Sequence, residues 1–170
     1  SYWILLCEEK INRLLLFADS IMKNIDIKIF PLIFLLFSLH LAKGDVRCSN
    51  PSAYINRFGG RDQQCVALVQ GLCHRSNGRF IGLTQSWRRG RHVRSNCNRI
   101  PPYTAIATFL GPNNHFDAPN WEQHAAIFMR CSKEGIVVFD QWVGHPCRLR
   151  TIPWNGFVRR YSGVNYYTIQ

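Results

Sequence analysis

The clearest hydrophobic pattern in the chain begins at Cys65 and has the spacing of a short amphipathic helix. Three apolar side chains can face a core while glutamines on either side stay in solvent. A glycine and then a Ser-Asn-Gly turn follow, and both favour the end of a helix. The sequence therefore predicts a helix from Cys65 to about Leu72, with its apolar face at Val66, Leu68 and Val69.

The second half of the chain changes to runs rich in β-branched and aromatic residues, which are typical of strands. A Ser-Lys-Glu-Gly turn separates two of these runs and predicts a β-hairpin. A loop or short helix is expected before them, at Thr84–Arg94. The helix followed by an antiparallel meander predicts an α+β fold. The predicted strands are Tyr103–Phe109, His124–Met129, Ile136–Trp142, Leu149–Ile152 and Asn165–Ile169.

The N-terminal part differs from this body. Met22 is followed by two lysines, by the apolar run Ile29–Leu41, and by an Ala-Lys-Gly sequence, which is the layout of a secretory signal peptide cleaved after Gly44. A signal anchor is the alternative because a second apolar patch lies upstream, but charged residues separate the two patches. We therefore predict a secreted protein with an upstream extension (1–21), a signal peptide (22–44) and a single domain (45–170).

Net charge narrows the expected partners. The chain carries +11, and from residue 45 onward 15 Arg and one Lys stand against six Asp and Glu, a net charge of +10. This excess argues for an anionic surface or polymer, although a basic face that only maintains solubility is the alternative. The basic run 88–94 follows Trp87, but no nucleic-acid-binding fold pattern accompanies it. We expect no specific nucleic-acid partner, and we interpret the run as a wall- or membrane-facing patch or a solvated loop.

Six cysteines follow residue 45, and an even set in a secreted domain suggests disulfides. If Cys65 is a free nucleophile, one of the other five must stay unpaired or bridge to another chain. The histidines lack a metal-ligand spacing and no C-x-x-C pair is present, so we expect no metal site and no cofactor. The six residues are Cys48, Cys65, Cys73, Cys97, Cys131 and Cys147.

Three residues combine into a candidate catalytic site. Cys65 lies on the first turn of the predicted helix, where unpaired N–H groups and the helix dipole favour a thiolate. His124 opens one predicted strand, and Asp140 lies near the end of the next, at the same end of the sheet. A carboxylate on one ring nitrogen turns the other nitrogen toward the thiol. The arrangement predicts acyl transfer through a thioester, with His124 as base and then acid.

The hairpin register decides whether Asp140 or Gln141 meets His124. If Cys131 pairs with Ile136 without a bulge, Gln141 lies on the His124 face, whereas a one-residue bulge or slip brings Asp140 there. We prefer Asp140 because a charge also stabilises the imidazolium. Alternatives for the three residues stay open: a disulfide or buried thiol for the cysteine, a satisfied half-buried histidine, and a strand-end or arginine contact for the aspartate.

Together, the Gln-Cys pair that opens a helix, the His-Ala-Ala-Ile strand start and the polar residue on the next strand resemble the papain-like NlpC and CHAP cysteine amidases. The likeness is closest to a small bacterial branch of that superfamily. The resemblance implies hydrolysis of peptidoglycan peptides, with Cys65 as nucleophile and His124 as base. Five blocks carry the resemblance in order: Cys65–Val69, Trp87–Val93, Ala105–Phe109, His124–Ile127 and Asp140–Trp142.

Further roles follow for residues near these blocks. Gln64, together with the Cys65 backbone N–H, is a candidate for an oxyanion hole, and a solvent-facing helix start is its alternative. We expect substrate contacts from Trp87, Arg88 and Trp142. The positions of the extra cysteines suggest the pairs Cys73–Cys97 and Cys131–Cys147, which would leave Cys48 unpaired and Cys65 free.

The sequence thus predicts a secreted, monomeric cysteine amidase or endopeptidase that acts on bacterial peptidoglycan. The rival hypothesis is a secreted cationic binding or antibacterial protein without catalysis. In the binding hypothesis Cys65 lies in one of three disulfides, so whether this thiol is free or bonded distinguishes the two hypotheses. An antibacterial action carried by the arginines would depend steeply on salt.

Overall fold

The computed structural model describes residues 44–116 and 122–170, so the predictions for residues 1–43 lie outside the described residues. None of the helices in these two ranges is long and apolar enough to cross a membrane. The described part has one α-helix, α3 (Cys65–Leu72), several short 3-10 helices, and eight strands in one sheet. The strands are β1 (Arg47–Cys48), β2 (Cys73–His74), β3 (Arg89–His92), β4 (Thr104–Thr108), β5 (Ala125–Cys131), β6 (Gly135–Trp142), β7 (His145–Pro153) and β8 (Tyr166–Ile169).

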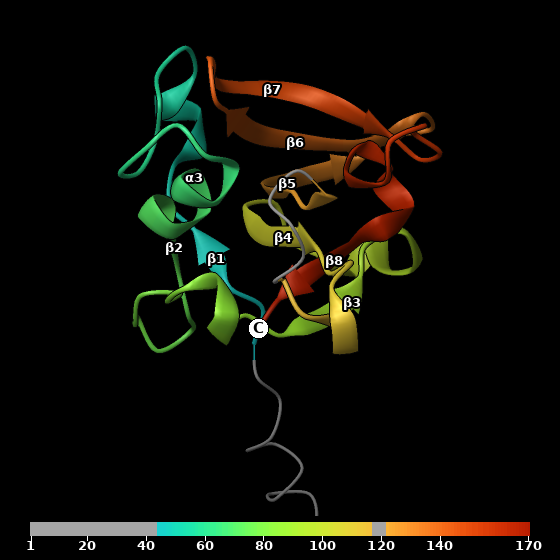
Figure 1. Cartoon of the computed structure of the whole chain (residues 1–170), viewed down its shortest axis with the longest axis horizontal. Coiled ribbons are helices and arrows are strands. Elements are labelled where there is room, and N and C mark those ends of the chain that lie inside the picture. The colour runs from blue at the N-terminus through green and yellow to red at the C-terminus, as the bar shows by residue number, and fades with distance from the viewer. Residues whose placement is uncertain (1–43, 117–121) are drawn as a thin grey trace, which may run out of the picture. The chain divides into compact units, whose positions relative to one another are not determined.

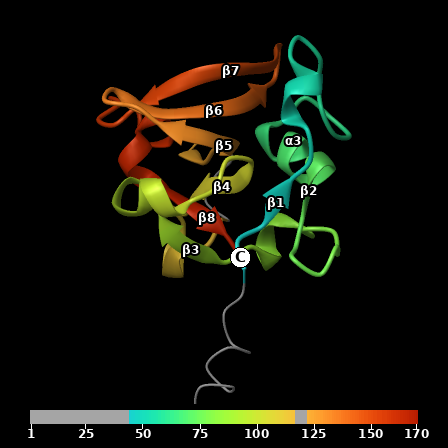
Figure 2. The same ribbon diagram turned by 180° about the vertical axis from the view of Figure 1, so that it is seen from behind.

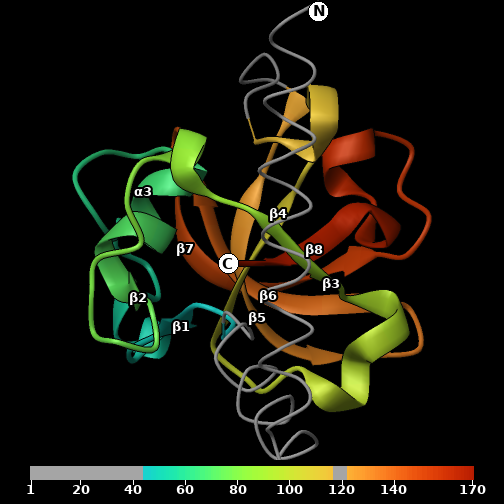
Figure 3. The same ribbon diagram turned by 90° about the horizontal axis from the view of Figure 1, so that it is seen from below.

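All strand pairs are antiparallel, and β4, β5, β6 and β7 follow one another as a meander. The other edge of β4 is shared by the two ends of the described chain, because β1 pairs with its start and β8 with its second half. Figures 1, 2 and 3 show α3 and β2 on one side of the meander and β3 and β8 on the other. The fold is therefore α+β with a mostly antiparallel sheet, as the sequence predicts.

The predicted helix has the expected bounds, and each predicted strand corresponds to one of β4 to β8, with ends that differ by a few residues. The strand β3 was not predicted, since the sequence favours a loop or short helix there. Its Arg-Gly-Arg-His sequence has no apolar alternation, and it forms a strand because it pairs with β8. Long-range pairing overrides local propensity at this position.

Side chains on the two faces of the sheet form two separate cores. On one face, Leu68 and Val69 of α3 pack with Ala125, Ile127 and Phe139 of the hairpin, so α3 lies against β5 and β6. Burying each such aliphatic side chain contributes about 1.5–3 kcal/mol. The opposite face buries a second set from the alternate positions of the same strands: Ile106, Ala126, Phe128, Val138 and Tyr166.

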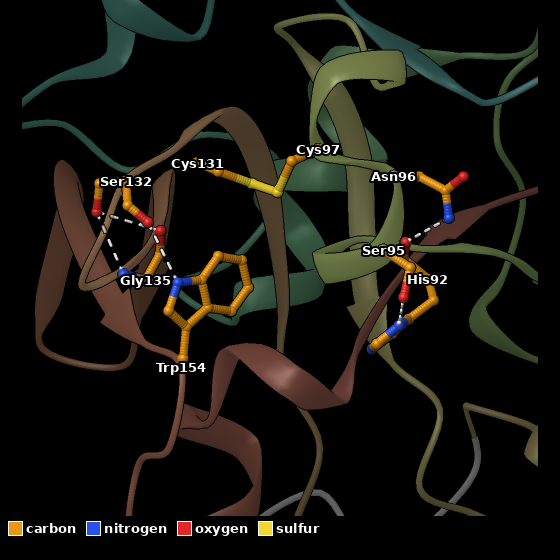
Figure 4. Close-up of a disulfide and its surroundings, with 8 residues drawn as sticks. All are labelled: His92, Ser95, Asn96, Cys97, Cys131, Ser132, Gly135 and Trp154. Carbon is orange, nitrogen blue, oxygen red and sulfur yellow. Dashed lines mark hydrogen bonds between the residues drawn. A yellow bond between two sulfur atoms is a disulfide. The ribbon is translucent and has the colours of Figure 1, made fainter.

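The disulfides differ from the expected pairs: Cys48 bonds Cys73, and Cys97 bonds Cys131. The first forms because β1 and β2 place Cys48 directly opposite Cys73. Cys131 is the last residue of β5 and lies opposite Ile136 near the start of β6, whereas Cys147 lies near the other end of β6. These two cysteines therefore cannot form a disulfide. Figure 4 shows the Cys97–Cys131 bond beside Trp154, which donates a hydrogen bond to the Ser132 carbonyl.

Candidate active site

Cys65 is the first residue of α3 and carries a half-buried, free thiol. Burial alone would raise the pKa of the Cys65 thiol, but a hydrogen bond with His124, the charge of that histidine and backbone hydrogen bonds at Ala125 and Val66 outweigh it. The pKa therefore lies below its ordinary value, and the site favours a thiolate.

His124 lies directly before β5 and is buried. Its backbone is fixed by Thr108 on β4, whose hydroxyl oxygen accepts the His124 N–H at 3.0 Å and whose N–H donates to the His124 carbonyl at 3.0 Å. The ring atom Nε2 lies 2.8 Å from Asp140 Oδ2. Because Nε2 is committed to the carboxylate, the hydrogen bond with the Cys65 thiol uses Nδ1.

The hairpin register explains why Asp140 reaches the histidine. Cys131 pairs with Ile136 as predicted, but the register shifts between Phe128 and Arg130, so that Phe128 faces Val138. This bulge brings Asp140, rather than Gln141, onto the face that carries His124. The sequence is compatible with either Asp140 or Gln141 beside His124, and the bulge selects Asp140, as we predicted.

Arg150 on β7 is the part of this site that the sequence did not reveal. Its Nε donates to both oxygens of Asp140 at 3.0 and 2.9 Å, and its Nη2 donates to Oδ2 at 2.6 Å. Arg148 lies directly opposite Asp140 on β7, which makes it an alternative arginine partner. Alternation along β7 places both arginines on the Asp140 face, but only the fold shows that Arg150 makes the ion pair.

The pKa shifts describe one connected charge network. Burial would lower the pKa of His124, but hydrogen bonds with Asp140 and Cys65 raise it to about 9. Burial would raise the pKa of Asp140, yet hydrogen bonds with His124 and Arg150 hold it below its ordinary value. At neutral pH these directions favour an ionised carboxylate, an imidazolium and a thiolate. Such a pair is the reactive form of a thiol nucleophile.

Aromatic side chains line the histidine. Its ring lies edge-on to Tyr161 and Trp142, with ring centroids 5.6 and 6.5 Å away. The half-buried Trp142 also stacks with Arg148, whose guanidinium carbon lies 4.5 Å from the ring centroid. Trp142 therefore borders the site, as a substrate contact should.

The other three residues predicted to belong to the site are Trp87, Arg88 and Gln64. Trp87 is fully buried against Phe116, so the expected substrate contact is wrong: its side chain belongs to the core. Arg88 is exposed and donates to the Gln85 and Trp87 carbonyls, and no contact among the described residues joins it to the candidate site. Gln64 directly precedes Cys65 in the chain and is exposed.

The state of the cysteines also bears on the rival hypothesis of a binding protein with three disulfides. The described residues contain two disulfides and two free cysteines, Cys65 and Cys147, which contradicts that arrangement. Cys147 is buried, and burial together with the charge of Asp140 raises its pKa to about 11. In the described ranges no group of three or more metal-ligating side chains is present.

Comparisons with known proteins bear on the family and on the fold. A family model described as domesticated amidase effector 2 matches residues 36–169. The chain is 41% identical over 128 residues to domesticated amidase effector 2 of Ixodes scapularis, which covers 74% of this chain and 84% of the relative. It is 36% identical over 83 residues to a type VI secretion amidase effector 2 protein of Salmonella typhi, covering 49% of this chain and 56% of that protein.

Among solved structures, type 6 secretion amidase effector 2 (Tae2) matches with a TM-score of 0.60 and 24% sequence identity, over 73% of this chain and 93% of that chain. This match shows a shared fold. The family match spans most of the chain, and the Ixodes scapularis relative exceeds 40% identity over most of its own length. The chain therefore belongs to the domesticated amidase effector 2 family and is a papain-like amidase of the NlpC/CHAP type.

Proposed function

We propose that the protein hydrolyses an amide bond in bacterial peptidoglycan peptides through a Cys65–His124–Asp140 mechanism. One observation carries the proposal: a free, half-buried thiol at the start of α3 is hydrogen-bonded to a histidine whose other nitrogen is held 2.8 Å from a buried carboxylate. Family membership supplies the reaction class. All three residues come from one chain, so we expect a monomer to be active.

The mechanism begins with the Cys65 thiolate, which attacks the carbonyl carbon of the substrate and forms a carbon–sulfur bond. The His124 imidazolium then gives its proton to the amide nitrogen, the carbon–nitrogen bond breaks, and the amine leaves. Water attacks the resulting thioester while neutral His124 takes one of its protons. The carbon–sulfur bond breaks, which releases a carboxylic acid and restores the thiolate. In this proposal Gln64 and the Cys65 N–H stabilise the oxyanion.

The reaction is tested by digesting purified peptidoglycan and analysing the soluble fragments by mass spectrometry. Each cut should create one new amine and one new carboxyl group and leave the glycosidic bonds intact. The position of the new amine identifies the bond and separates an amidase from an endopeptidase. Wall fragments that bind the protein but gain no amine would contradict hydrolysis and support a binding protein.

Trp142 and Arg88 are proposed to contact the substrate. Trp142→Ala should raise KM about tenfold, which corresponds to about 1.4 kcal/mol of lost binding, and should change kcat little. Arg88→Ala should raise KM less, and its effect should shrink at high salt because the contact is exposed. Steady-state kinetics on soluble wall peptides measure both values, and circular dichroism checks the fold. An unchanged KM for either variant would remove that residue from the substrate site.

The proposed setting is extracellular, where the enzyme would act on bacteria in defence or in handling of them. The signal-peptide layout of residues 22–44, the disulfides and the basic charge support this setting. Sequencing the N-terminus of protein recovered from culture medium should find Asp45 first. Retention of the unprocessed chain inside the cell would contradict this setting.

A further inference from the structure

We propose that Gln141 is a positioning residue that sets the placement of Cys65 relative to His124. The inference rests on the proposed function, because it concerns the geometry of the same site. It arises from the strand β6, where two consecutive side chains point to opposite faces of the sheet. Asp140 holds His124 on one face, and Gln141 reaches the loop that precedes Cys65 on the other.

The Gln141 amide holds both ends of that loop, residues 59–64. Its Oε1 accepts a hydrogen bond from the Gly59 N–H at 2.7 Å. Its Nε2 lies within hydrogen-bonding distance of three carbonyl oxygens, those of Gly59 (2.9 Å), Asp62 (3.1 Å) and Gln64 (3.0 Å). The side chain is fully buried, so water does not compete for these bonds. One amide group therefore fixes the backbone up to the residue before the nucleophile.

The loop in turn lies directly on α3. Gly60 has φ +80°, and a Cβ there would stand 1.9 Å from the Ala67 carbonyl oxygen. A Cβ on Gly71 would stand 2.7 Å from the Gly60 Cα. The Gln64 carbonyl also accepts the Ala67 N–H at 3.1 Å, in addition to the bond from Gln141. Backbone contact this close means that a displacement of the loop displaces the start of the helix.

The chemistry of these four contacts suits a glutamine. The three carbonyl oxygens share the two N–H bonds of Nε2, the Gly59 N–H needs an acceptor, and the carboxamide supplies both functions from one side chain. An ionised glutamate would bring two acceptor oxygens against the carbonyls. Two neighbouring residues of β6 thus position the two reacting groups: Asp140 positions His124, and Gln141 positions Cys65 through its loop. Because both come from one strand, the relative motion of the thiol and the imidazole is limited.

Loss of the amide should loosen the start of α3 and weaken the contact between the Cys65 thiol and His124. Because that contact lowers the pKa of the thiol, the pH midpoint of Cys65 alkylation should move upward in Gln141→Met. We expect kcat to fall about 100-fold, the effect of a misplacement of about 1 Å, with KM changed less than about twofold. Gln141→Glu keeps the size and the Gly59 acceptor and should shift both quantities in the same direction.

A matched control is Gln70→Met on the same helix. The Gln70 Nε2 donates to the Gly82 carbonyl at 3.2 Å, so this variant also removes a glutamine-to-backbone bond, but away from the thiol. It should lower the thermal midpoint without moving the alkylation midpoint. An unchanged alkylation midpoint in a folded Gln141→Met or Gln141→Glu protein would overturn the proposal. Alkylation needs no substrate and therefore tests the role of Gln141 alone. A failure of the proposed function would show instead as a wild-type enzyme that does not cut peptidoglycan.

Discussion

Replacement of Cys65 by alanine is expected to reduce amide hydrolysis at least about 10⁴-fold and to leave the protein folded. The thiolate forms the covalent bond to the acyl group, and no other described side chain can take that role at the His124 Nδ1. Folding should persist because Cys65 is half-buried and free, and alanine favours a helix. Release of new amines from peptidoglycan measures the loss, and circular dichroism measures the fold.

The other free thiol supplies the control. Cys147→Ala should keep its activity, because Cys147 lies buried on β7 and its pKa is raised to about 11. In protein that begins at Asp45, iodoacetamide at neutral pH should label one cysteine in the native state, Cys65, and two after denaturation without reduction. Hydrolysis that survives in Cys65→Ala, or rapid native labelling of Cys147 instead, would refute the assignment of the nucleophile.

Asp140→Asn is expected to lower kcat about 10²–10⁴-fold, because the neutral amide can neither hold the His124 ring in the same way nor stabilise its charge. In the wild type, activity should decline as pH rises through about 9, where His124 loses its proton. Removal of the Asp140 charge should move this alkaline limb to lower pH. The pH dependence of kcat/KM measures both effects, and an unmoved limb would show that Asp140 does not act on the histidine.

The same substitution should lower stability by about 1–3 kcal/mol at neutral pH, because it leaves the partly buried Arg150 without its carboxylate. The folded pKa of Asp140 is depressed, so its stabilising contribution is present above about pH 4 and is lost as pH falls further. Urea denaturation at several pH values tests this dependence.

Arg150→Met is the matched variant, since it breaks the same ion pair but retains the bond between Asp140 and His124. Its stability should fall by a similar amount, while kcat should fall less than about tenfold. An activity loss as large as that of Asp140→Asn would mean that the arginine, rather than the carboxylate, controls the histidine.

Local patterns in the sequence determined a large part of this protein. The apolar spacing after Cys65 and the glycines beyond it specify α3, and the hairpin turn brings the start of β5 and the end of β6 to the same end of the sheet. These features depend on neighbours within a few residues, so a single sequence reveals them. They also indicate a cysteine, a histidine and a carboxylate as candidates for one site.

Only the tertiary structure decided the finer arrangement. The bulge between Phe128 and Arg130 selects Asp140 over Gln141 for the histidine, and it leaves Gln141 to hold the loop before Cys65. The ion pair of Arg150, the disulfide partners and the burial of Trp87 likewise depend on residues distant in sequence. The reason is physical: a side chain's face and partner follow from register and packing between strands, and a shift of one residue reverses them.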